Sequence, residues 1–303
     1  MVSVYITSYN KSRYIAESIE SVLSQTIQPA EIIIVDDASN DNSREIIKGY
    51  QSRYPRKIKT IYHENNYGIS KARNTAIKNC GEDIITFLDA DDYYFPRKIE
   101  TELKKIKHKE YGCVYSNHKF IDENGNDQGI FSKTTDTPAE GQIFIENFIR
   151  SFNVSSGKNF HNEMFYKSYA KKIGLYDEKI KIWEDWDFRI RMSKEFKYGY
   201  CSEINSVYRK LNNGLAQNST VELHYREQIK IYKKNKHLLE KIDRKSQKII
   251  NNRIFSWLKD YFIKLSRNNL DNKKYFIFFV DMIEFIITFN FKKSFLFVFK
   301  NIK

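Results

Sequence analysis

The sequence predicts an α/β protein with a mostly parallel sheet, helices on both faces of the sheet, and a helical C-terminal extension. In the first 116 residues, short β-branched runs alternate with segments whose apolar residues recur at helical spacing. One run, EIIIVDD at 31–37, is almost continuously apolar, which is typical of a strand buried on both faces. No segment after about residue 217 has the pattern of a strand. Alternating strands and helices imply parallel strands joined by helical crossovers.

The elements of this first part follow one another in a regular order. The expected strands are VSVYIT, EIIIVDD, KIKTIYH, DIITFLD and GCVYSN, at residues 2–7, 31–37, 57–63, 83–89 and 112–117. Asn10 or Ser12 is expected to cap the first helix, in which Ile15, Ile19, Val22 and Leu23 recur at helical spacing. Further helices are expected at 43–50 and 70–79, and Pro96 fits the first turn of a fourth.

The rest of the chain changes character in steps. Residues 117–140 contain DENGNDQG and predict a hairpin or surface loop, and residues 140–210 mix helices with short strands. Lysine-rich helices are expected at 217–239 and 243–266. We therefore expect an α/β domain over 1–215 and a helical, basic and aromatic region over 216–303.

Composition indicates a folded, reduced protein. The 303 residues are 41% hydrophobic and 29% charged, which are globular proportions. Three separated cysteines form no metal or disulfide pattern, and the N-terminus has no signal-peptide pattern. The net charge is +13, and residues 221–303 alone hold 19 Lys and Arg against 8 Asp and Glu. This asymmetry favours an anionic partner surface for the tail.

Polar and acidic residues gather where three expected strands end. They are Thr7, Tyr9 and Asn10 after the first strand, Asp36 and Asp37 after the second, and Asp89, Asp91 and Asp92 after the fourth. The carboxyl ends of parallel strands meet at one edge of a sheet, where ligands bind. Clustered carboxylates repel one another unless a cation such as Mg²⁺, completed by phosphates and water, neutralises them.

Six segments, in order, resemble glycosyltransferase family 2. They are VSVYITSYNKSRYIAESIESVLSQT, IIIVDDASNDNS, ENNYGISKARNTAI, ITFLDADD, MFYKSYAKKIGLYDE and WEDWDFRIRM, and together they span about residues 2–210. The resemblance implies the nucleotide-sugar fold called GT-A. It also implies an inverting, metal-dependent transferase of the hexosyltransferase type, which moves a sugar from a nucleotide-diphosphate donor, expected to be a UDP-sugar, to an acceptor hydroxyl.

The resemblance also implies roles for residues that bind the nucleotide. Thr7 and Tyr9 would line the nucleotide pocket, with the tyrosine near the base. Asp37 would accept a hydrogen bond from the base, and a carboxylate suits the imide N–H of uracil. Arg73 would lie near the diphosphate, and Asp89 would contact the ribose or a metal-bound water.

Two further carboxylates would carry the chemistry. Asp91, the third residue of the D-x-D motif, would bind Mg²⁺ or Mn²⁺, which stabilises charge on the leaving diphosphate. Asp185 in WEDWDFRIR would be the general base, because inversion requires a proton acceptor on the face opposite the leaving group. Glu184 is the second candidate for this role.

One position departs from the family pattern. Members often carry a histidine two residues after YR, near the metal, and this chain has Leu211 there. The departure implies a lost metal ligand or a more open site. His161, just before NEMFYKS, could touch the acceptor, although a packed or exposed histidine is the commoner outcome.

The aromatic stretch 275–289 is too short to span a membrane and contains Asp281 and Glu284. Its composition fits two readings equally, an amphipathic segment on an anionic membrane surface or a helix packed on the catalytic domain. Nucleic acid is excluded as a partner because no binding motif accompanies the charge. We expect a cytoplasmic protein, peripheral at the inner face of the plasma membrane if the tail binds lipid.

Two alternatives to a transferase remain. A nucleotidyltransferase would normally carry a glycine-rich loop after the first strand, and TSYNKSRY has no glycine. A catalytically impaired nucleotide-sugar-binding module is supported by Leu211 alone. For the transferase, the expected acceptor is a sugar, lipid-linked or glycan precursor of a surface polysaccharide or glycoconjugate.

Overall fold

The computed structural model describes residues 1–108, 110–212, 214, 218–240, 242–253 and 256. The chain divides after Ile231 into two compact units, and the first unit, Met1–Ile231, contains the whole sheet. The strands are β1 (Val2–Ser8), β2 (Glu31–Asp36), β3 (Ile58–Tyr62), β4 (Ile84–Asp89), β5 (Tyr93–Tyr94), β6 (Tyr111–Asp122), β7 (Asp127–Ile130), β8 (Met164–Tyr166) and β9 (Lys197–Lys210). The helices are α1 (Ile15–Leu23), α2 (Ser43–Arg53), α3 (Ile69–Asn79), α4 (Lys98–Ile106), α5 (Phe144–Ile149), α6 (Lys167–Lys172), α7 (Glu184–Glu195), α9 (Val221–Asn235) and the 3₁₀ helix η1 (Lys236–Leu239).

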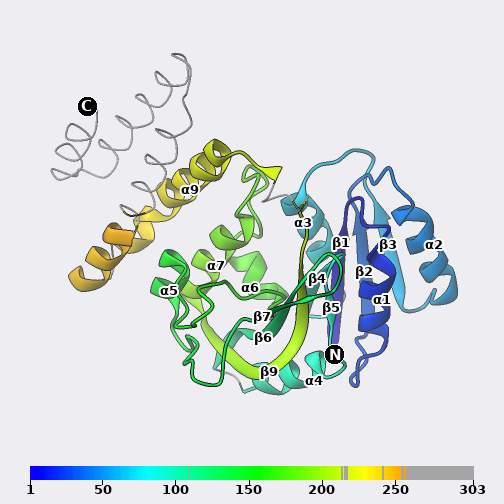
Figure 1. Ribbon diagram of the computed structural model, residues 1–303, viewed down its shortest axis with the longest axis horizontal. Helices are drawn as coiled ribbons and strands as arrows, with labels where there is room; N and C mark the ends of the chain where they lie inside the picture. Colours follow the sequence, from blue (N-terminus) through cyan, green and yellow to red (C-terminus); the bar gives the residue numbers. More distant parts are fainter. Residues whose placement is uncertain (109, 213, 215–217, 241, 254–255, 257–303) are drawn as a thin grey trace, which may run out of the picture. The chain divides into compact units, whose positions relative to one another are not determined.

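The sheet confirms the predicted fold class. Its strand order is β3-β2-β1-β4-β8-β6-β9-β5, with β7 paired to β6 (Figure 1). Strands β3, β2, β1 and β4 are parallel, as are β6 and β9, while β5, β7 and β8 pair antiparallel. The chain runs outward from β1 through β2 to β3 and then returns to place β4 on the other side of β1. The junction of β1 and β4 is thus the topological switch point, the place where such sheets bind ligands.

Two hydrophobic cores lie on the two faces of the sheet. On one face, Ile19 of α1, Ile47 of α2 and Ile99 of α4 pack with Val4 and Ile6 of β1. Residues of α3 and α7 pack on the other face with alternate residues of the same strands, such as Tyr5 and Ile33 (Figure 1). Strands β1 and β2 are buried along their whole length, and the apolar run of β2 is the pattern expected for a strand covered on both faces.

The first unit confirms the expected strands and helices of residues 1–116 and corrects some details. The first residue of α1 is preceded by Tyr14, with no side-chain cap, so neither Asn10 nor Ser12 caps this helix. The backbone N–H groups of Tyr14 and Ile15 donate instead to the Lys11 carbonyl, each at 2.9 Å. Pro96 lies just before the cap of α4 rather than in its first turn.

The region after residue 117 contains the expected hairpin and one unexpected long strand. Strands β6 and β7 form an antiparallel pair across the DENGN turn. Strand β9 is 14 residues long, longer than the short strands expected there, because it runs parallel to β6 along most of its length.

The second unit begins at Tyr232, and its described part is helical. It includes η1 and a helical segment over residues 244–253. The aromatic stretch 275–289 lies outside the described residues. None of the described helices combines the length and apolar character that a membrane span requires.

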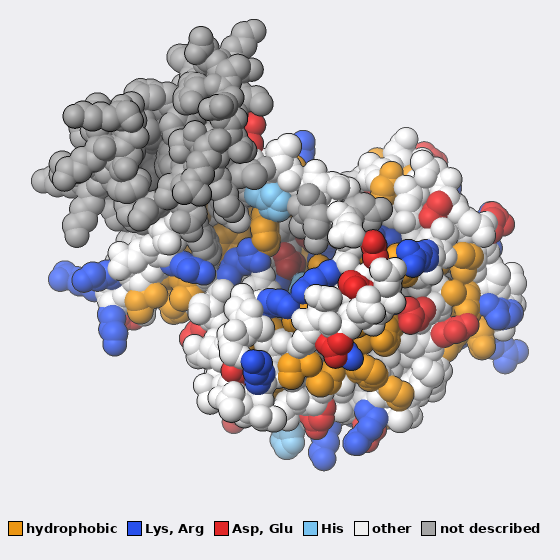
Figure 2. All heavy atoms as spheres, in the orientation of Figure 1, with side chains coloured by type: hydrophobic (Ala, Val, Ile, Leu, Met, Phe, Trp, Pro, Cys, Tyr) orange, Lys and Arg blue, Asp and Glu red, His pale blue; other side chains and the backbone are white. Residues whose placement is uncertain are grey.

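The visible surface carries charges of both signs. On the face shown in Figure 2, lysine and arginine side chains of the described residues lie interspersed with aspartates and glutamates. This agrees with the near balance of charge that the sequence places in its first 220 residues.

Candidate active site at the strand ends

The switch point brings three of the predicted site residues together. Thr7 of β1 and Asp89 of β4 are register partners at the carboxyl ends of their strands. The Thr7 hydroxyl donates to Asp89 Oδ1 at 3.2 Å. Arg73 of α3 reaches the same carboxylate, with Nη2 at 3.1 Å from both Asp89 oxygens. One charged cluster therefore joins the two strand ends.

Arg73 connects this cluster to α7. Its Nη1 donates to Glu184 Oε1 at 2.9 Å, 111 positions later in the chain. The guanidinium also lies over the rings of Phe87 and Tyr176, at 4.9 and 5.3 Å from their centroids. Arg73 is buried, and the carboxylates of Asp89 and Glu184 are its charged partners. The first turn of α7, and with it Asp185, is thereby held at the strand-end edge.

Residues in the left-handed region flank the predicted site. Asn10, Ala38 and Trp183 have φ of 53°, 65° and 68°. They immediately follow Tyr9 and Asp37 and immediately precede Glu184. Left-handed backbone costs energy in residues with a Cβ and concentrates at functional sites, so these turns are consistent with a functional site at this edge.

The two carboxylates of α7 have opposite electrostatic environments. Burial raises the pKa of Asp185, but the charges of Arg189, Arg150 and Arg73 outweigh it and bring the pKa to about 2. Arg189 Nη1 donates to Asp185 Oδ2 at 2.7 Å. Burial raises the pKa of Glu184 to about 7, against the charge of Arg73 and with the help of the negative charge on Asp185. Asp185 is also the more exposed, with 22% of its side chain accessible against 10% for Glu184.

The D-x-D turn is held by two cations that sequence reasoning missed. Lys11 Nζ lies 2.7 Å from Asp91 Oδ2. Arg209 of β9 donates from its backbone N–H to Asp92 Oδ1 at 2.8 Å and from Nε to the Asp91 carbonyl at 3.0 Å. Lys11 follows a predicted site segment, but the position of Arg209 depends on a strand pairing that the sequence does not reveal.

This turn fits a divalent ion that a ligand helps to coordinate. Among the described residues, no group of three His, Cys, Asp or Glu is placed to hold a metal by itself. Burial raises the pKa of Asp91, and the neighbouring Asp89 raises it further, while Lys11 lowers it. Mg²⁺ is usually held by only one or two carboxylates together with substrate phosphates, so such a donor set is sufficient. Leu211 is buried.

Asp37 lies on the same edge and is strongly hydrogen-bonded. Its Oδ1 accepts from His63 Nδ1 at 2.6 Å and from the Tyr67 backbone N–H at 3.1 Å, and its Oδ2 accepts from the Gly68 N–H at 2.7 Å. Gly68 immediately precedes α3, the helix that carries Arg73. A carboxylate has about four acceptor positions, so three internal bonds leave one for a ligand. His63, which follows β3, is a further strand-end residue that sequence reasoning missed.

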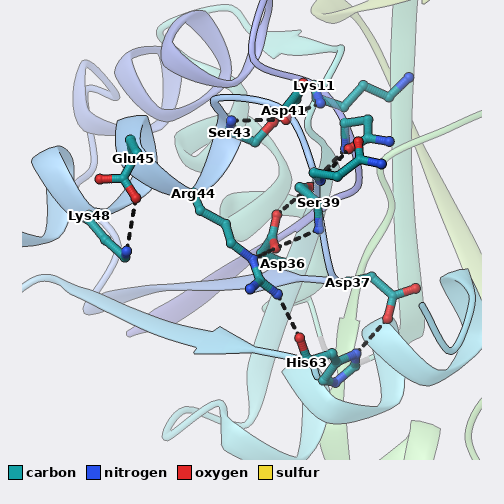
Figure 3. Close-up of polar contacts among 12 residues, drawn as sticks. Lys11, Asp36, Asp37, Ser39, Asp41, Ser43, Arg44, Glu45, Lys48 and His63 are labelled. Carbon is teal, nitrogen blue, oxygen red and sulfur yellow. Dashed lines mark hydrogen bonds and ion pairs between the residues drawn. The ribbon is translucent and has the colours of Figure 1, made fainter. Parts of the chain in front are cut away.

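Asp36, the preceding residue, is buried, and its carboxylate is bonded within the protein. Figure 3 shows its carboxylate bonded to Ser39 and Arg44, whereas Asp37 bonds to His63. Arg44 Nε donates to Asp36 Oδ1 at 2.7 Å, and Arg44 Nη2 donates to the His63 carbonyl at 2.6 Å. Tyr9, beyond the end of β1, is 43% exposed and open to a ligand.

The geometry can be compared with known proteins. Residues 3–174 match the family model described as glycosyl transferase family 2. The chain belongs to glycosyl transferase family 2. It is 33% identical over 242 residues to an uncharacterized glycosyltransferase of Methanocaldococcus jannaschii, covering 78% of this chain and 80% of the relative. It is also 34% identical to the chondroitin synthase of Escherichia coli over 60% of this chain, but spans only 28% of that synthase.

Solved structures support the fold of this family member. TarS of S. aureus, residues 1–349 in complex with UDP-GlcNAc, has a TM-score of 0.64 at 19% identity, covering 88% of this chain and 74% of that chain. GalNAc-T7 with UDP, GalNAc and Mn²⁺ has a TM-score of 0.59 at 16% identity, covering 77% and 47% of the two chains. At these identities the likeness establishes the shared GT-A architecture.

Proposed function

We propose that this glycosyltransferase moves a sugar from a UDP-linked donor to an acceptor hydroxyl with inversion at the anomeric carbon. The main support for this function is the Arg73 bridge, which joins the strand-end carboxylate Asp89 to Glu184, next to Asp185. Residues from three distant stretches of chain thus meet at the switch point, where α/β sheets bind ligands. The fold shared with TarS in complex with UDP-GlcNAc supports a uridine donor.

The nucleotide would bind across the ends of β1, β2 and β4. Thr7 and the exposed ring of Tyr9 would line the base and ribose pocket, and Asp37 would accept the uracil N3–H at its remaining acceptor position. Asp89 would contact the ribose or a metal-bound water. Arg73 lies in the same cluster, near the expected diphosphate, and its bonds to Asp89 and Glu184 would keep both carboxylates in position.

Asp91, with Asp89 beside it, would hold Mg²⁺ or Mn²⁺ together with the diphosphate. Such an ion supplies neutralisation of the charge that develops on the leaving diphosphate. The Lys11 ammonium lies 2.7 Å from the Asp91 carboxylate, so on binding of the ion it would share the negative charge of Asp91 or move away.

Asp185 would act as the general base. The acceptor oxygen attacks the anomeric carbon, the bond from that carbon to the diphosphate oxygen breaks, and the hydroxyl proton passes to the Asp185 carboxylate. Both carboxylates are paired with an arginine, and Asp185 is preferred over Glu184 because its side chain is more accessible. An α-linked donor would therefore give a β-glycoside.

A donor screen tests this function. The protein would be incubated with a panel of UDP-sugars, Mn²⁺ and sugar or lipid-linked acceptors, and UDP release would be measured. We expect release with at least one donor and its loss in Asp91→Ala. Background release with every donor, together with an unchanged signal in Asp91→Ala, would contradict a metal-dependent transferase.

The acceptor is proposed to be a glycan or lipid-linked precursor of a surface polysaccharide. The basic composition of residues 221–303 supports a peripheral position at the cytoplasmic face of an anionic membrane. Co-sedimentation of the full chain with vesicles tests this part. Binding to phosphatidylserine vesicles that weakens with salt is expected, and equal recovery with neutral phosphatidylcholine vesicles would argue against it.

A further inference from the structure

Two lysines share one aromatic ring at the side of the active site. Lys158 lies in the loop that precedes β8, Lys210 is the last residue of β9, and Phe120 lies on β6. The Nζ atoms of Lys158 and Lys210 are 3.8 and 4.9 Å from the centroid of the Phe120 ring. Burial lowers the pKa of the Lys158 ammonium to about 8, and the neighbouring Lys210 contributes to this shift. The two side chains therefore bring like charges together.

Neighbouring cations are neutralised, but this pair is not. Lys119, next to Phe120, has Asp127 at 2.8 Å, and Arg209, next to Lys210, has Glu17 at 2.6 Å. Within the described part of the chain, neither Lys158 nor Lys210 has a carboxylate within 4.0 Å. Two adjacent ammonium groups without a counter-charge repel each other, and an anion bound between them would relieve this repulsion.

A short row of aromatic rings extends from the lysine pair. The Tyr208 ring is 5.9 Å from the Phe120 ring and stacks on His161 at 4.4 Å. Burial raises the pKa of Tyr208, and the negative charges of Asp92, Asp91, Asp89 and Asp185 raise it further. Tyr208 also immediately precedes Arg209, which bonds to Asp92 and to the Asp91 carbonyl, so this residue adjoins the D-x-D turn.

His161 completes this row. Burial and the charge of Arg189 lower the pKa of His161 to about 3, and the negative charge on Asp185 acts in the opposite direction. The ring of His161 is thus neutral at physiological pH. His161 lies two residues before Glu163, and Arg189 donates to both Glu163 and Asp185, so this row of rings ends near the proposed general base. A group that contacts the base could extend along Tyr208 and His161 towards the lysines.

We propose that Lys158 and Lys210 bind an anionic group, a phosphate or a carboxylate, that belongs to the acceptor. The acceptor hydroxyl would face Asp185, and Tyr208 and His161 would lie between the hydroxyl and the anion. This inference rests on the proposed function, because it specifies the acceptor of that same site. It restricts the acceptor to saccharides or polyols that carry a negative charge.

A binding experiment on the full chain saturated with UDP tests this subsite. Glycerol 3-phosphate, methyl glucuronide and the neutral methyl glucoside would be titrated at low salt and followed by ligand-observed NMR. At least one anion is expected to bind more tightly than the glucoside, and the preferred anion identifies phosphate or carboxylate as the natural group. In Lys158→Gln/Lys210→Gln, binding of that anion is expected to weaken about tenfold, because two charge-assisted contacts are lost.

Two control variants make the result specific. Lys158→Arg/Lys210→Arg retains the charge and should retain anion binding, and Lys119→Gln removes a neighbouring lysine that is already paired and should change nothing. Unchanged anion affinity in the double glutamine variant would overturn the proposal, as would equal binding of the glucoside.

The affinity for UDP separates this proposal from the transferase function. UDP binding is expected to be the same in wild type and the double glutamine variant. Weaker UDP binding in that variant would assign the lysines to the donor and overturn the acceptor site. A wild-type protein that binds the anion through the lysines but does not bind UDP would contradict the proposed function and leave the lysine pair as an anion site.

Discussion

At the scale of single residues, the two adjacent carboxylates of α7 differ most. Asp185 has a pKa of about 2 because three arginine charges outweigh its burial, and Glu184 has a pKa of about 7 because its burial dominates. Neighbouring titratable groups whose pKa values are driven apart are typical of active sites. Asp185 is ionised at every working pH, so it can accept a proton and also stabilise a positively charged transition state.

Asp185→Asn keeps the size of the side chain but removes its charge. We expect sugar transfer to fall about 100- to 10,000-fold, the range for loss of a general base, while UDP affinity stays unchanged. Initial rates of UDP release and calorimetric UDP binding measure the two effects. Glu195→Gln at the other end of α7, where Glu195 is exposed and pairs with Lys172, is the matched control and should retain full activity. A fully active Asp185→Asn variant would transfer the role to another group.

The pKa of about 7 for Glu184 predicts a pH response of sugar transfer. Below a pH of about 7 Glu184 is protonated, and above that value its negative charge adds to that of Asp185 and increases the basicity of the site. We therefore expect the rate of transfer to rise with pH through about 7 and Glu184→Gln to remove this inflection. The pH dependence of turnover in both proteins provides the check. An inflection that persists in Glu184→Gln must come from a different group.

In the proposed function, Lys11 would compete with the metal ion for Asp91. In Lys11→Met the carboxylate loses the ammonium at 2.7 Å, and we expect the Mn²⁺ concentration needed for half-maximal UDP release to fall. Lys48→Met is the control, because Lys48 is exposed and pairs with Glu45 on α2. A higher Mn²⁺ requirement in Lys11→Met would show that Lys11 supports ion or diphosphate binding rather than opposing it.

At the scale of elements, α3 holds α7 against the sheet through one side chain. Arg73 of α3 is 6% exposed and bridges Asp89 of β4 and Glu184 of α7. Asp37 fixes the start of α3 through the N–H groups of Tyr67 and Gly68. The part of the proposed site that would bind the nucleotide is thus connected, through α3 and Arg73, to the part that carries the proposed general base.

Arg73→Met leaves the buried carboxylate of Glu184 and the partly exposed carboxylate of Asp89 without their cation. We expect the free energy of unfolding to fall by about 3–5 kcal/mol, because breaking a buried pair leaves uncompensated charge. Chemical denaturation of wild type and variant measures this change. Lys71→Met on the same helix removes a solvent-exposed pair with Glu178 and should cost less than about 1 kcal/mol. Equal effects of the two substitutions would show that the bridge does not hold the elements together.

Strand β9 shows where element-level prediction from sequence fails. Its polar residues Ser202, Glu203 and Asn205 interrupt the apolar pattern, so the sequence indicates only short strands there. The strand extends over 14 residues because β6 pairs with it along most of its length, with register shifts that no local pattern encodes. Arg209 reaches the D-x-D turn because β9 also pairs with β5, in which Tyr93 is the partner of Val207.

At the scale of the whole molecule, the sequence predicts the site to the extent that it predicts the parallel sheet. The strand pattern predicts that Thr7 and Asp89 lie at one edge of the sheet, whereas the pairing of β1 with β4, which brings them into contact, comes from the structure. The partners Lys11, His63 and Arg209 depend on side-chain contacts between distant segments, which no single-sequence pattern specifies. The predicted boundary at residue 215 stays a prediction, as do the roles assigned to the site residues.

The central claim is that separate carboxylates share one nucleotide-sugar site at the switch point. A crystal structure of the protein with UDP and Mn²⁺ tests it most directly. We expect the uracil beside Asp37 and Tyr9, the diphosphate and the ion at Asp91, and Asp185 facing the open side of the β-phosphate. UDP bound away from the ends of β1, β2 and β4, or an ion held without Asp91, would contradict the claim.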